Sequence, residues 1–407
     1  MIKVFDGRLP FGMETSKPGY IETASLTLLY ISIYIKDVAS SWMSNVLAGS
    51  LLAIGMVLGF ASITMSRRLL AHGAGRYSMP LLAGWLMIWI LTLAATGNVN
   101  YSSYYVAIPC AIIVVNTRPR FFIKVLLIHL ALTLLIQSGE YFGGQYLFIY
   151  EASDGTVLDE ILFGGGLGIF RAKGLFQGPL SAVAFALWIA FLLRGSVFSV
   201  AALFVCAFFA SGRLGMLTAT LLMLVRLLGN GRSSNGMATK IPLLAGLAVV
   251  VGLLFAYSDE NRLFFILNAL DIGNDQNVSR TTFWLTSLTH YLSYSPLEQL
   301  LGNYGFIQLK EGGTENDFLR LLLDCGLLGF LIYFCAIAVL LVRALRRRDR
   351  EDLAITVLIV VLMNIFPFIQ SLSSGLLFWV YFFSTMNRKC TMETSDIRRY
   401  RNRRLTK

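Results

Sequence analysis

Charged residues are scarce in this chain. Only 14% of its 407 residues are Asp, Glu, Lys or Arg, whereas 56% are apolar. A soluble domain averages about 25% charged and about 45 to 50% apolar residues. A single water-surrounded core of this size cannot bury so many apolar side chains, so we expect lipid to be the solvent. The composition therefore excludes a soluble enzyme.

Paired cysteines and several common catalytic motifs are also absent. No CxxC pair occurs among the five cysteines, which are Cys110, Cys206, Cys325, Cys335 and Cys390. The chain has no HExxH, GxSxG, P-loop or DxD motif. We therefore expect no metal site, no disulfide framework and no cofactor. Nucleotide-driven chemistry and soluble hydrolase chemistry are disfavoured for the same reason.

Long apolar runs dominate what is present. A spanning helix needs roughly 20 mostly apolar residues. About twelve stretches of that kind follow one another along the chain: 20–40, 45–65, 78–97, 101–117, 121–138, 175–194, 196–211, 213–229, 241–258, 317–342, 353–370 and 373–388. We predict an all-α, polytopic integral membrane protein in which residues 1–407 form a single membrane domain. The short turn at 194–196 leaves open whether one broken helix or two helices surround it.

The distribution of charge predicts an orientation. The formal net charge is +11, which in a soluble protein would indicate a nucleic-acid partner. In a membrane protein, Lys and Arg near span ends are retained on the cytoplasmic side. Placing the N-terminus inside puts most of the 34 Lys and Arg residues into inner segments, including the basic tail at 389–407. We therefore predict two cytoplasmic termini, a tail that contacts anionic membrane lipids and no nucleic-acid partner.

Two long outer loops are predicted, at 139–174 and 259–316. Long structured loops are where a rigid scaffold usually carries its chemistry. The second loop contains SRTTFWLTSLTHYL, which has the pattern of an amphipathic helix. Ser279 is its expected N-cap, and Phe283, Trp284, Leu288 and Tyr291 recur at helical spacing.

Three arginines on the outer side are not explained by the charge rule. Arg213 lies in SGRLG between two apolar stretches, Arg171 precedes a span, and Arg280 opens the amphipathic helix. A guanidinium binds phosphate through two parallel hydrogen bonds and stays charged, so three of them together predict a site for an anion such as a lipid diphosphate. The alternatives are that Arg213 extends to the lipid headgroups and that Arg171 and Arg280 form ordinary surface ion pairs.

Carboxylates and aromatic residues complete the candidate site. Glu315 and Asp317 precede the apolar stretch at 317–342, where they are either a general base and a ligand for substrate or solvated first-turn acids of a helix capped by Thr314 or Asn316. Asp324, two helical turns further on, is a candidate because carboxylates inside a membrane are usually functional.

Trp284 and Tyr291 can stack on sugar rings, although aromatic residues at a membrane interface more often act as anchors. His290 is the only histidine expected outside, and we assign it to substrate binding; the simpler interpretation is a polar-face residue of the helix.

Four segments together resemble the superfamily of O-antigen polymerases and O-antigen ligases, which are membrane glycosyltransferases. RAKGLFQGP is similar to the family's Arg-x-x-Gly-Phe segment, and ASGRLGMLTA to its Ser-Arg turn between two spans. RTTFWLTSLTHYLSYSPLEQLLGNYGF resembles its Arg-then-Trp helix with a Pro-Leu and Gly-rich turn. ENDFLRLLLDCGLLGF resembles its motif of His-Asn-x-Tyr-Leu before a Gly-Leu-Leu-Gly span, but Glu315 stands where the ligase branch has the His implicated as base. The polymerase branch is therefore preferred.

The resemblance implies a fold like that of the GT-C membrane glycosyltransferases, in the bacterial inner membrane with its site facing the periplasm. It implies transfer of a growing glycan from undecaprenyl diphosphate to an incoming lipid-linked repeat unit, by an inverting, metal-independent reaction. Arg171, Arg213 and Arg280 match the family's arginines, and a chain-length-regulating co-polymerase is an implied partner.

Two other functions stay open. An O-antigen ligase would share the architecture but transfer the glycan to lipid A core. A flippase for lipid-linked oligosaccharides, which is not an enzyme, would be expected to show two repeated halves and charges near the membrane midplane.

Overall fold

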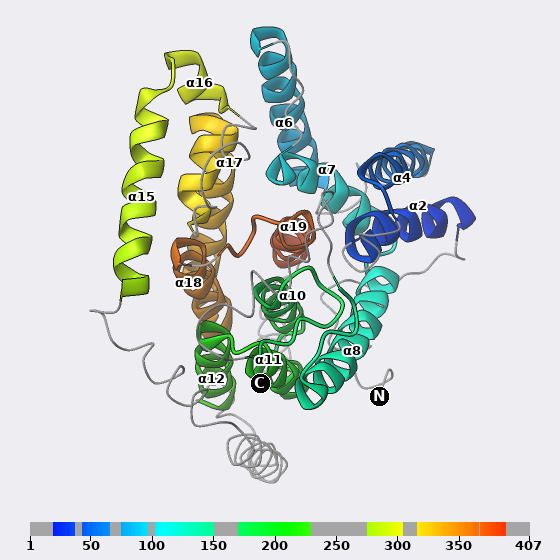
Figure 1. The fold of residues 1–407 in the computed structure, drawn as a ribbon. Coiled ribbons are helices and arrows are strands. Elements are labelled where there is room, and N and C mark those ends of the chain that lie inside the picture. Colours follow the sequence, from blue (N-terminus) through cyan, green and yellow to red (C-terminus); the bar gives the residue numbers. More distant parts are fainter. Residues whose placement is uncertain are drawn as a thin grey trace, which may run out of the picture.

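The computed structural model describes residues 19–36, 43–65, 75–96, 102–149, 170–228, 275–303, 316–365 and 367–387. Every regular element within these ranges is a helix (Figure 1). The elements are α2 (Tyr20–Tyr30), the π-helix η1 (Ile31–Ile35), α4 (Asn45–Met65), α6 (Gly75–Thr96), α7 (Ser103–Asn116), α8 (Pro119–Gly143), α10 (Pro179–Leu192), α11 (Val197–Phe209), α12 (Arg213–Leu228), α15 (Asp275–Ser293), α16 (Pro296–Leu301), α17 (Asp317–Arg347), α18 (Arg350–Ile365) and α19 (Leu372–Asn387).

The predicted apolar stretches coincide with these helices. Each stretch that falls on described residues overlaps one helix, α2 and η1 together forming the first, whereas 241–258 lies outside the described residues. The turn at 194–196 separates two helices, because α10 ends at Leu192 and α11 begins at Val197. In the described part of the chain, α4, α6, α8 and α17 are long and apolar enough to cross a membrane. The protein is thus helical and membrane-embedded, and twelve crossings stay a prediction.

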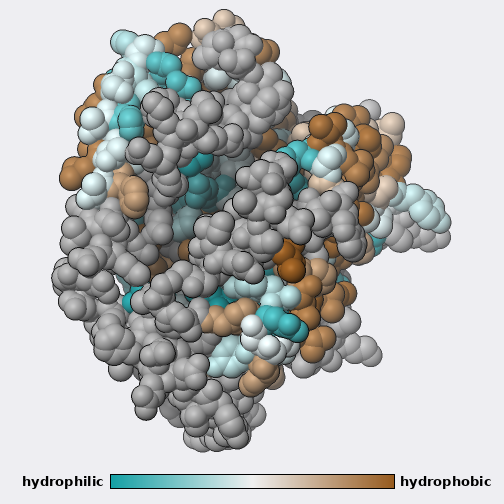
Figure 2. All heavy atoms as spheres, in the orientation of Figure 1, coloured by the Kyte–Doolittle hydropathy of each residue, from teal (hydrophilic) through white to brown (hydrophobic). Residues whose placement is uncertain are grey.

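The outward faces of these long helices are apolar. Val57 on α4 and Leu135 on α8 are 69% and 68% exposed, and large apolar side chains are also exposed on α6, α17 and α18. The brown residues of Figure 2 cover much of the surface that is coloured. Soluble monomers rarely expose apolar surface on this scale. The outer surface of the helices is therefore suited to contact with acyl chains.

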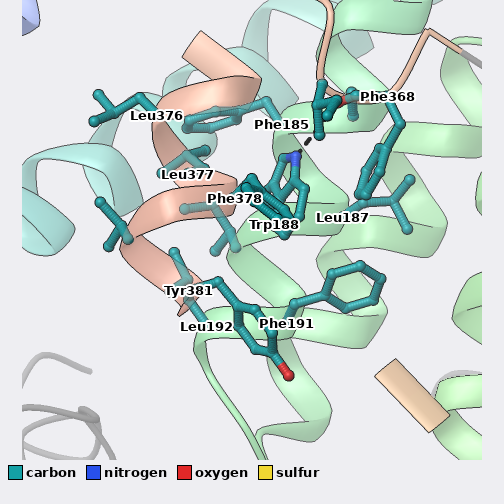
Figure 3. Packing of buried hydrophobic residues seen from close by; sticks show 14 of the residues in the cluster. Phe185, Leu187, Trp188, Phe191, Leu192, Phe368, Leu376, Leu377, Phe378 and Tyr381 are labelled. Atoms are coloured by element: carbon teal, nitrogen blue, oxygen red, sulfur yellow. Dashed lines mark hydrogen bonds between the residues drawn. The ribbon is translucent and has the colours of Figure 1, made fainter. Parts of the chain in front are cut away.

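Two helices that are apolar on every side, α10 and α19, form the centre of the molecule (Figure 1). A helix of that kind is stable only when it is surrounded. Trp188 of α10 stacks on Phe368 with ring centroids 4.4 Å apart, and its indole N–H donates to the Phe368 carbonyl at 3.4 Å (Figure 3). The connection between α18 and α19 is thereby fixed against α10.

Helix ends group into two sets, as expected for successive helices that alternate in direction. Ends expected on one side are bonded to one another and so are those expected on the other. Four bonds show the grouping: Arg171 to Ala210 at 3.1 Å and Phe368 to Asp317 at 2.7 Å on the expected outer side, and Arg118 to Thr23 at 3.1 Å and Arg226 to Glu351 at 2.9 Å on the expected inner side.

A contact between two glycines fastens α16 to a kink in α17. Gly302, just after α16, has φ 87° and ψ 165°, and Gly326 inside α17 has φ 64° and ψ −171°. Both conformations belong almost entirely to glycine. A Cβ on Gly302 would lie 2.4 Å from the Asp324 carbonyl oxygen, and a Cβ on Gly326 would lie 2.4 Å from the Gly302 nitrogen. The kink therefore needs glycine at both positions, 302 and 326.

We predict that Gly302→Ala detaches α16 from α17. Backbone strain and steric overlap together cost about 2 kcal/mol or more, so the melting temperature of the detergent-solubilised protein is expected to fall. Gly84→Ala is the control, because a Cβ there meets nothing within 4 Å and alanine favours a helix. An unchanged melting temperature in Gly302→Ala would show that this contact is not needed.

Candidate functional site

The start of α17 is anchored by Asn316 and Asp317. Asn316 is the N-cap residue: its side-chain oxygen accepts from the Leu319 N–H at 3.0 Å. Asp317 is 1% exposed. One oxygen of its carboxylate accepts from the Tyr104 hydroxyl at 3.0 Å, and the other accepts from the Phe368 N–H at 2.7 Å and from the next backbone N–H at 2.8 Å.

The interpretation of Asp317 as a solvated first-turn acid is therefore wrong. Because its carboxylate is occupied by α7 and by the α18–α19 connection, Asp317 holds three parts of the chain together just after Glu315. Its assignment to substrate binding stays a prediction, and the geometry favours a positioning role.

A buried ion pair lies two turns into α17. Arg320 Nε and Asp324 Oδ2 are 2.8 Å apart, and both side chains are largely buried. Tyr294, which connects α15 to α16, is buried nearby. Burial, together with the charges of Asp324 and Glu298, raises the pKa of Tyr294 above its usual range. Charges buried in a membrane protein usually face a partner or a polar cavity, and Figure 2 shows a hollow with hydrophilic residues on the side where Figure 1 places α15, α16 and α17.

A capping box orders α16 beside this pair. The Ser295 hydroxyl accepts from the Glu298 N–H at 3.4 Å, and the Glu298 carboxylate accepts from the Ser295 N–H at 2.9 Å and from Asn303 at 2.8 Å. Hydrogen bonds from the Ser295 side chain and backbone lower the pKa of Glu298 below its usual range. Reciprocal capping of this kind stabilises even a short helix.

The structure brings the segments of Arg171 and Arg213 together. Arg171 Nε donates to the Ala210 carbonyl at 3.1 Å, in the turn between α11 and α12. Arg213 is the first residue of α12, and the turn before it contains Ser211 at φ 51°. A helix N-terminus presents N–H groups and a positive dipole end to an anion. Two of the predicted arginines thus stand beside one anion-compatible helix end.

Helix α10 connects this region to the start of α17. A Cβ on Gly215 of α12 would lie 2.5 Å from a methyl group of Val183 in α10, so the two helices touch there. Further along α10, Trp188 stacks on Phe368, whose N–H is bonded to Asp317. One fully buried helix therefore sets the spacing between the arginine segments and the acidic segment.

Of the other predicted site residues, the structure describes the side chains of Trp284, His290 and Tyr291. Arg280 lies in α15, but its side chain and all of Glu315 lie outside the described residues. Trp284 and His290 are half-buried on α15, and the Tyr291 hydroxyl donates to the Gln299 carbonyl at 2.9 Å. The helix predicted at 279–292 is confirmed, but Ser279 is not its N-cap, because α15 already begins at Asp275. The sequence did not predict the earlier start, because the first residues of α15, among them Asp275 and Gln276, are polar and do not belong to the apolar pattern from which the helix was predicted.

Glu140, which the sequence analysis did not single out, organises the segment that carries Arg171. Its carboxylate is buried and accepts from the backbone N–H groups of Lys173 and Gly174, each at 2.9 Å, and from that of Leu147 at 3.3 Å. It continues a buried polar row on α8, formed by His129, Thr133 and Gln137. Polar residues four apart within an apolar helix were the available signal.

Among the described residues no three His, Cys, Asp or Glu side chains are grouped to hold a metal ion. The structure instead places Arg171 and Arg213 at the start of α12, and Asp317 and Asp324 in the first two turns of α17. No family model and no curated protein matches the chain.

Proposed function

We propose that the protein polymerises lipid-linked repeat units of a bacterial surface glycan such as O-antigen. It would transfer the growing chain from undecaprenyl diphosphate to the incoming repeat unit, on the periplasmic face of the inner membrane, using a GT-C-like fold of twelve spans with both termini in the cytoplasm. The observation that carries this proposal is the placement of Arg171 and Arg213 at the N-terminus of α12, joined through α10 to the segment that follows Glu315.

The proposed reaction assigns a role to each group. A hydroxyl oxygen of the acceptor sugar attacks C1 of the donor sugar, and its proton passes to the Glu315 carboxylate. The bond from C1 to the diphosphate oxygen breaks, and undecaprenyl diphosphate leaves with the electron pair. Arg171, Arg213 and Arg280 bind the diphosphate, where fixed cations stabilise the developing charge. No redox step or metal ion is required.

The surroundings support a fixed site of this kind. Asp317 holds α7, α17 and the α18–α19 connection. Tyr294 lies near the buried Arg320–Asp324 pair, and the ring centroid of Tyr291 on α15 is 6.0 Å from that of Tyr294. Rigid supporting contacts keep catalytic groups in their productive geometry. The aromatic side chains offer faces on which sugar rings stack.

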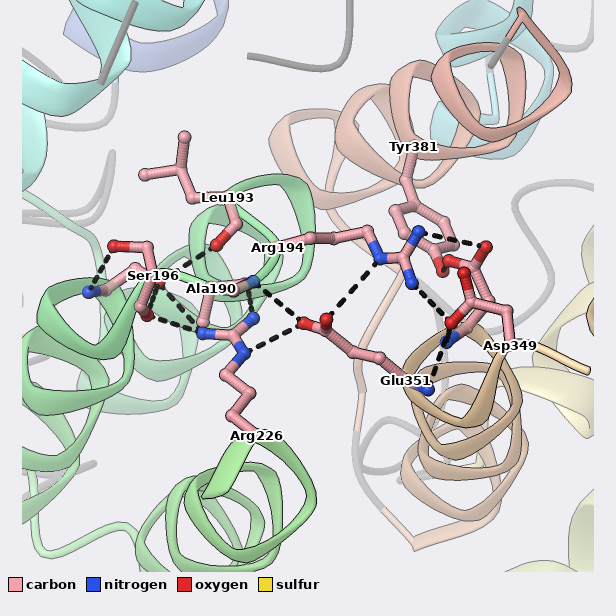
Figure 4. Close-up of polar contacts among 11 residues, drawn as sticks. Ala190, Leu193, Arg194, Ser196, Arg226, Asp349, Glu351 and Tyr381 are labelled. Atoms are coloured by element: carbon pink, nitrogen blue, oxygen red, sulfur yellow. Dashed lines mark hydrogen bonds and ion pairs between the residues drawn. The ribbon is translucent and has the colours of Figure 1, made fainter. Parts of the chain in front are cut away.

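The opposite end of the bundle is closed by a network of charges (Figure 4). Arg194, between α10 and α11, pairs with Asp349 at 2.6 Å and with Asp352 at 3.1 Å. Arg226 of α12 is 4% exposed and pairs with Glu351 at 2.9 Å. These bonds tie three helices to the start of α18.

This network favours an enzyme over the flippase alternative. Arg226 also donates to the backbone carbonyls of Ser196 at 2.6 Å and Ala190 at 2.7 Å. A transporter that works by alternating access must open this end in each cycle, and opening it would separate the bonds between the helices that move apart. Breaking buried charge pairs is costly, whereas a glycosyltransferase with its site at the other end never needs to open it.

Purified protein incubated with a single lipid-linked repeat unit tests the proposal on a gel. A ladder of products separated by one repeat unit is the expected result. Product that forms only when lipid A core is added would identify a ligase. Movement of the substrate across vesicles without bond formation would identify a flippase. Either of the last two results would replace the proposed function.

A further inference from the structure

Helix α15 presents three different sectors around its axis. Toward α17 it presents half-buried or buried Trp284, Ser287, Tyr291 and Tyr294. A second, exposed sector consists of leucines. At 100° per residue, Leu285, Leu288 and Leu292 share that sector, and Leu285 and Leu292 are 61% and 65% exposed.

The third sector is polar and exposed. Thr286 lies roughly 100° around the helix from Leu285, and Ser293 lies on the same side. The hydroxyl of Ser293 donates to the His290 carbonyl at 2.7 Å. Of the two exposed sectors of α15, the one with Thr286 and Ser293 is therefore suited to water, whereas the leucine sector is not.

The placement of the leucines is the reverse of that in a soluble protein. A surface helix in water turns its apolar stripe toward the core and its polar residues outward. Here Trp284, Ser287 and Tyr291 lie in the sector toward α17, and the leucines face away. The chain also carries no Asp, Glu, Lys or Arg from 281 to 297. Such an arrangement is stable when the surroundings of the leucine sector are themselves apolar.

Exposed apolar residues follow the leucine sector along the chain, on α16 and on α17. Leu297 and Leu300 of α16 are exposed too, and α16 ends on the kink of α17 through the Gly302–Gly326 contact. Directly after that kink, the exposed apolar residues of α17 begin with Leu327. Helix α17 is long and apolar enough to cross a membrane, and α16 is fastened to it, so lipid around α17 would reach α16 and the adjoining α15 as well. Figure 2 shows brown residues along this edge.

We infer that α15 and α16 lie in the membrane interface, with Leu285, Leu288 and Leu292 inserted among the acyl chains of the adjacent leaflet. Amphipathic helices bind this region through buried apolar area. The polar sector with Thr286 and Ser293 faces water, and the sector with Trp284 and Tyr291 faces α17.

Spin labels in lipid vesicles test this position. Leu285→Cys and Leu292→Cys are each labelled with a nitroxide in full-length protein whose five native cysteines are replaced by alanine, and reconstituted in phosphatidylcholine vesicles. Thr286→Cys is the matched control on the same helix. Power saturation measures collisions with O2, which concentrates in acyl chains, and with a water-soluble nickel chelate. Gel filtration and an unchanged melting temperature establish that each variant is folded.

The expected result is a severalfold higher ratio of O2 to nickel collisions at positions 285 and 292 than at 286. Equal access of the nickel chelate to all three positions would overturn the inference, because α15 would then be surrounded by water. Dipolar broadening between labels at 292 that disappears on dilution with unlabelled protein would overturn it in a different way, by showing that a second copy of the chain covers the leucines. These readouts do not depend on glycosyl transfer.

Discussion

Glu315→Gln is expected to lower the rate of repeat-unit polymerisation by about 10²- to 10⁴-fold, the usual contribution of a general base. Glutamine keeps the size of the side chain but cannot take a proton from the acceptor hydroxyl. The residues that follow are held firmly, since Asn316 caps α17 and donates to the Asn364 carbonyl at 3.0 Å. The substitution should therefore leave the fold intact, and the measurement is the initial rate of ladder formation with purified lipid-linked repeat units.

Two further variants sharpen this test. Glu311→Gln removes a carboxylate four residues earlier in the same segment and is expected to retain full activity. Glu315→His introduces another base at the same place and is expected to retain more activity than Glu315→Gln. Full turnover by Glu315→Gln would reject the role of Glu315 as the base.

Arg213→Ala is the second change with a large expected effect. Removing one donor that stabilises charge in the transition state typically lowers the rate by about 10²- to 10³-fold. Arg213 opens α12 beside the Arg171 segment, and in the proposed site its guanidinium and the helix dipole would act on the same anion. The variant should accumulate unpolymerised repeat units in cells, and long chains should disappear from a polysaccharide gel.

Further arginine variants distinguish the effect of the positive charge on polymerisation from the effect of the planar guanidinium group. Arg280→Ala is expected to behave like Arg213→Ala, and Arg213→Lys is expected to be intermediate because lysine keeps the charge but not the planar fork. Arg262→Ala, in the same predicted outer loop as Arg280, is the control and should keep normal chain lengths. Wild-type ladders in both Arg213→Ala and Arg280→Ala would contradict the arginine site.

The helices were readable from the sequence because they depend on local composition. Runs of about 20 apolar residues have one stable backbone in lipid, a helix that satisfies its own hydrogen bonds. Even the separation of α10 from α11 has a local cause, since Gly195 adopts φ 65° in the turn and Ser196 caps α11. The α15 helix was found from its spacing of apolar residues, although its start was misplaced.

The site was less readable because it depends on contacts between distant segments. Asp317 has the sequence context of a solvated helix-start acid, and only packing against Tyr104 and Phe368 shows that it is buried. Arg226 fitted the rule for cytoplasmic charges, and nothing in its neighbourhood indicated a bond to Glu351, 125 residues later. The glycine contact at Gly302 and Gly326 is equally invisible in either segment alone.

Formation of glycosidic bonds between lipid-linked repeat units, at the expense of the diphosphate linkage, is the activity that we propose for this protein. It is tested most directly by counting products of the purified protein in buffer that contains a metal chelator, with mass spectrometry of the released lipid. We expect one undecaprenyl diphosphate to be released for each new linkage, with a yield that the chelator does not diminish and that is lost in Glu315→Gln. Linkages formed without release of that lipid, or no linkage from repeat units alone, would contradict it.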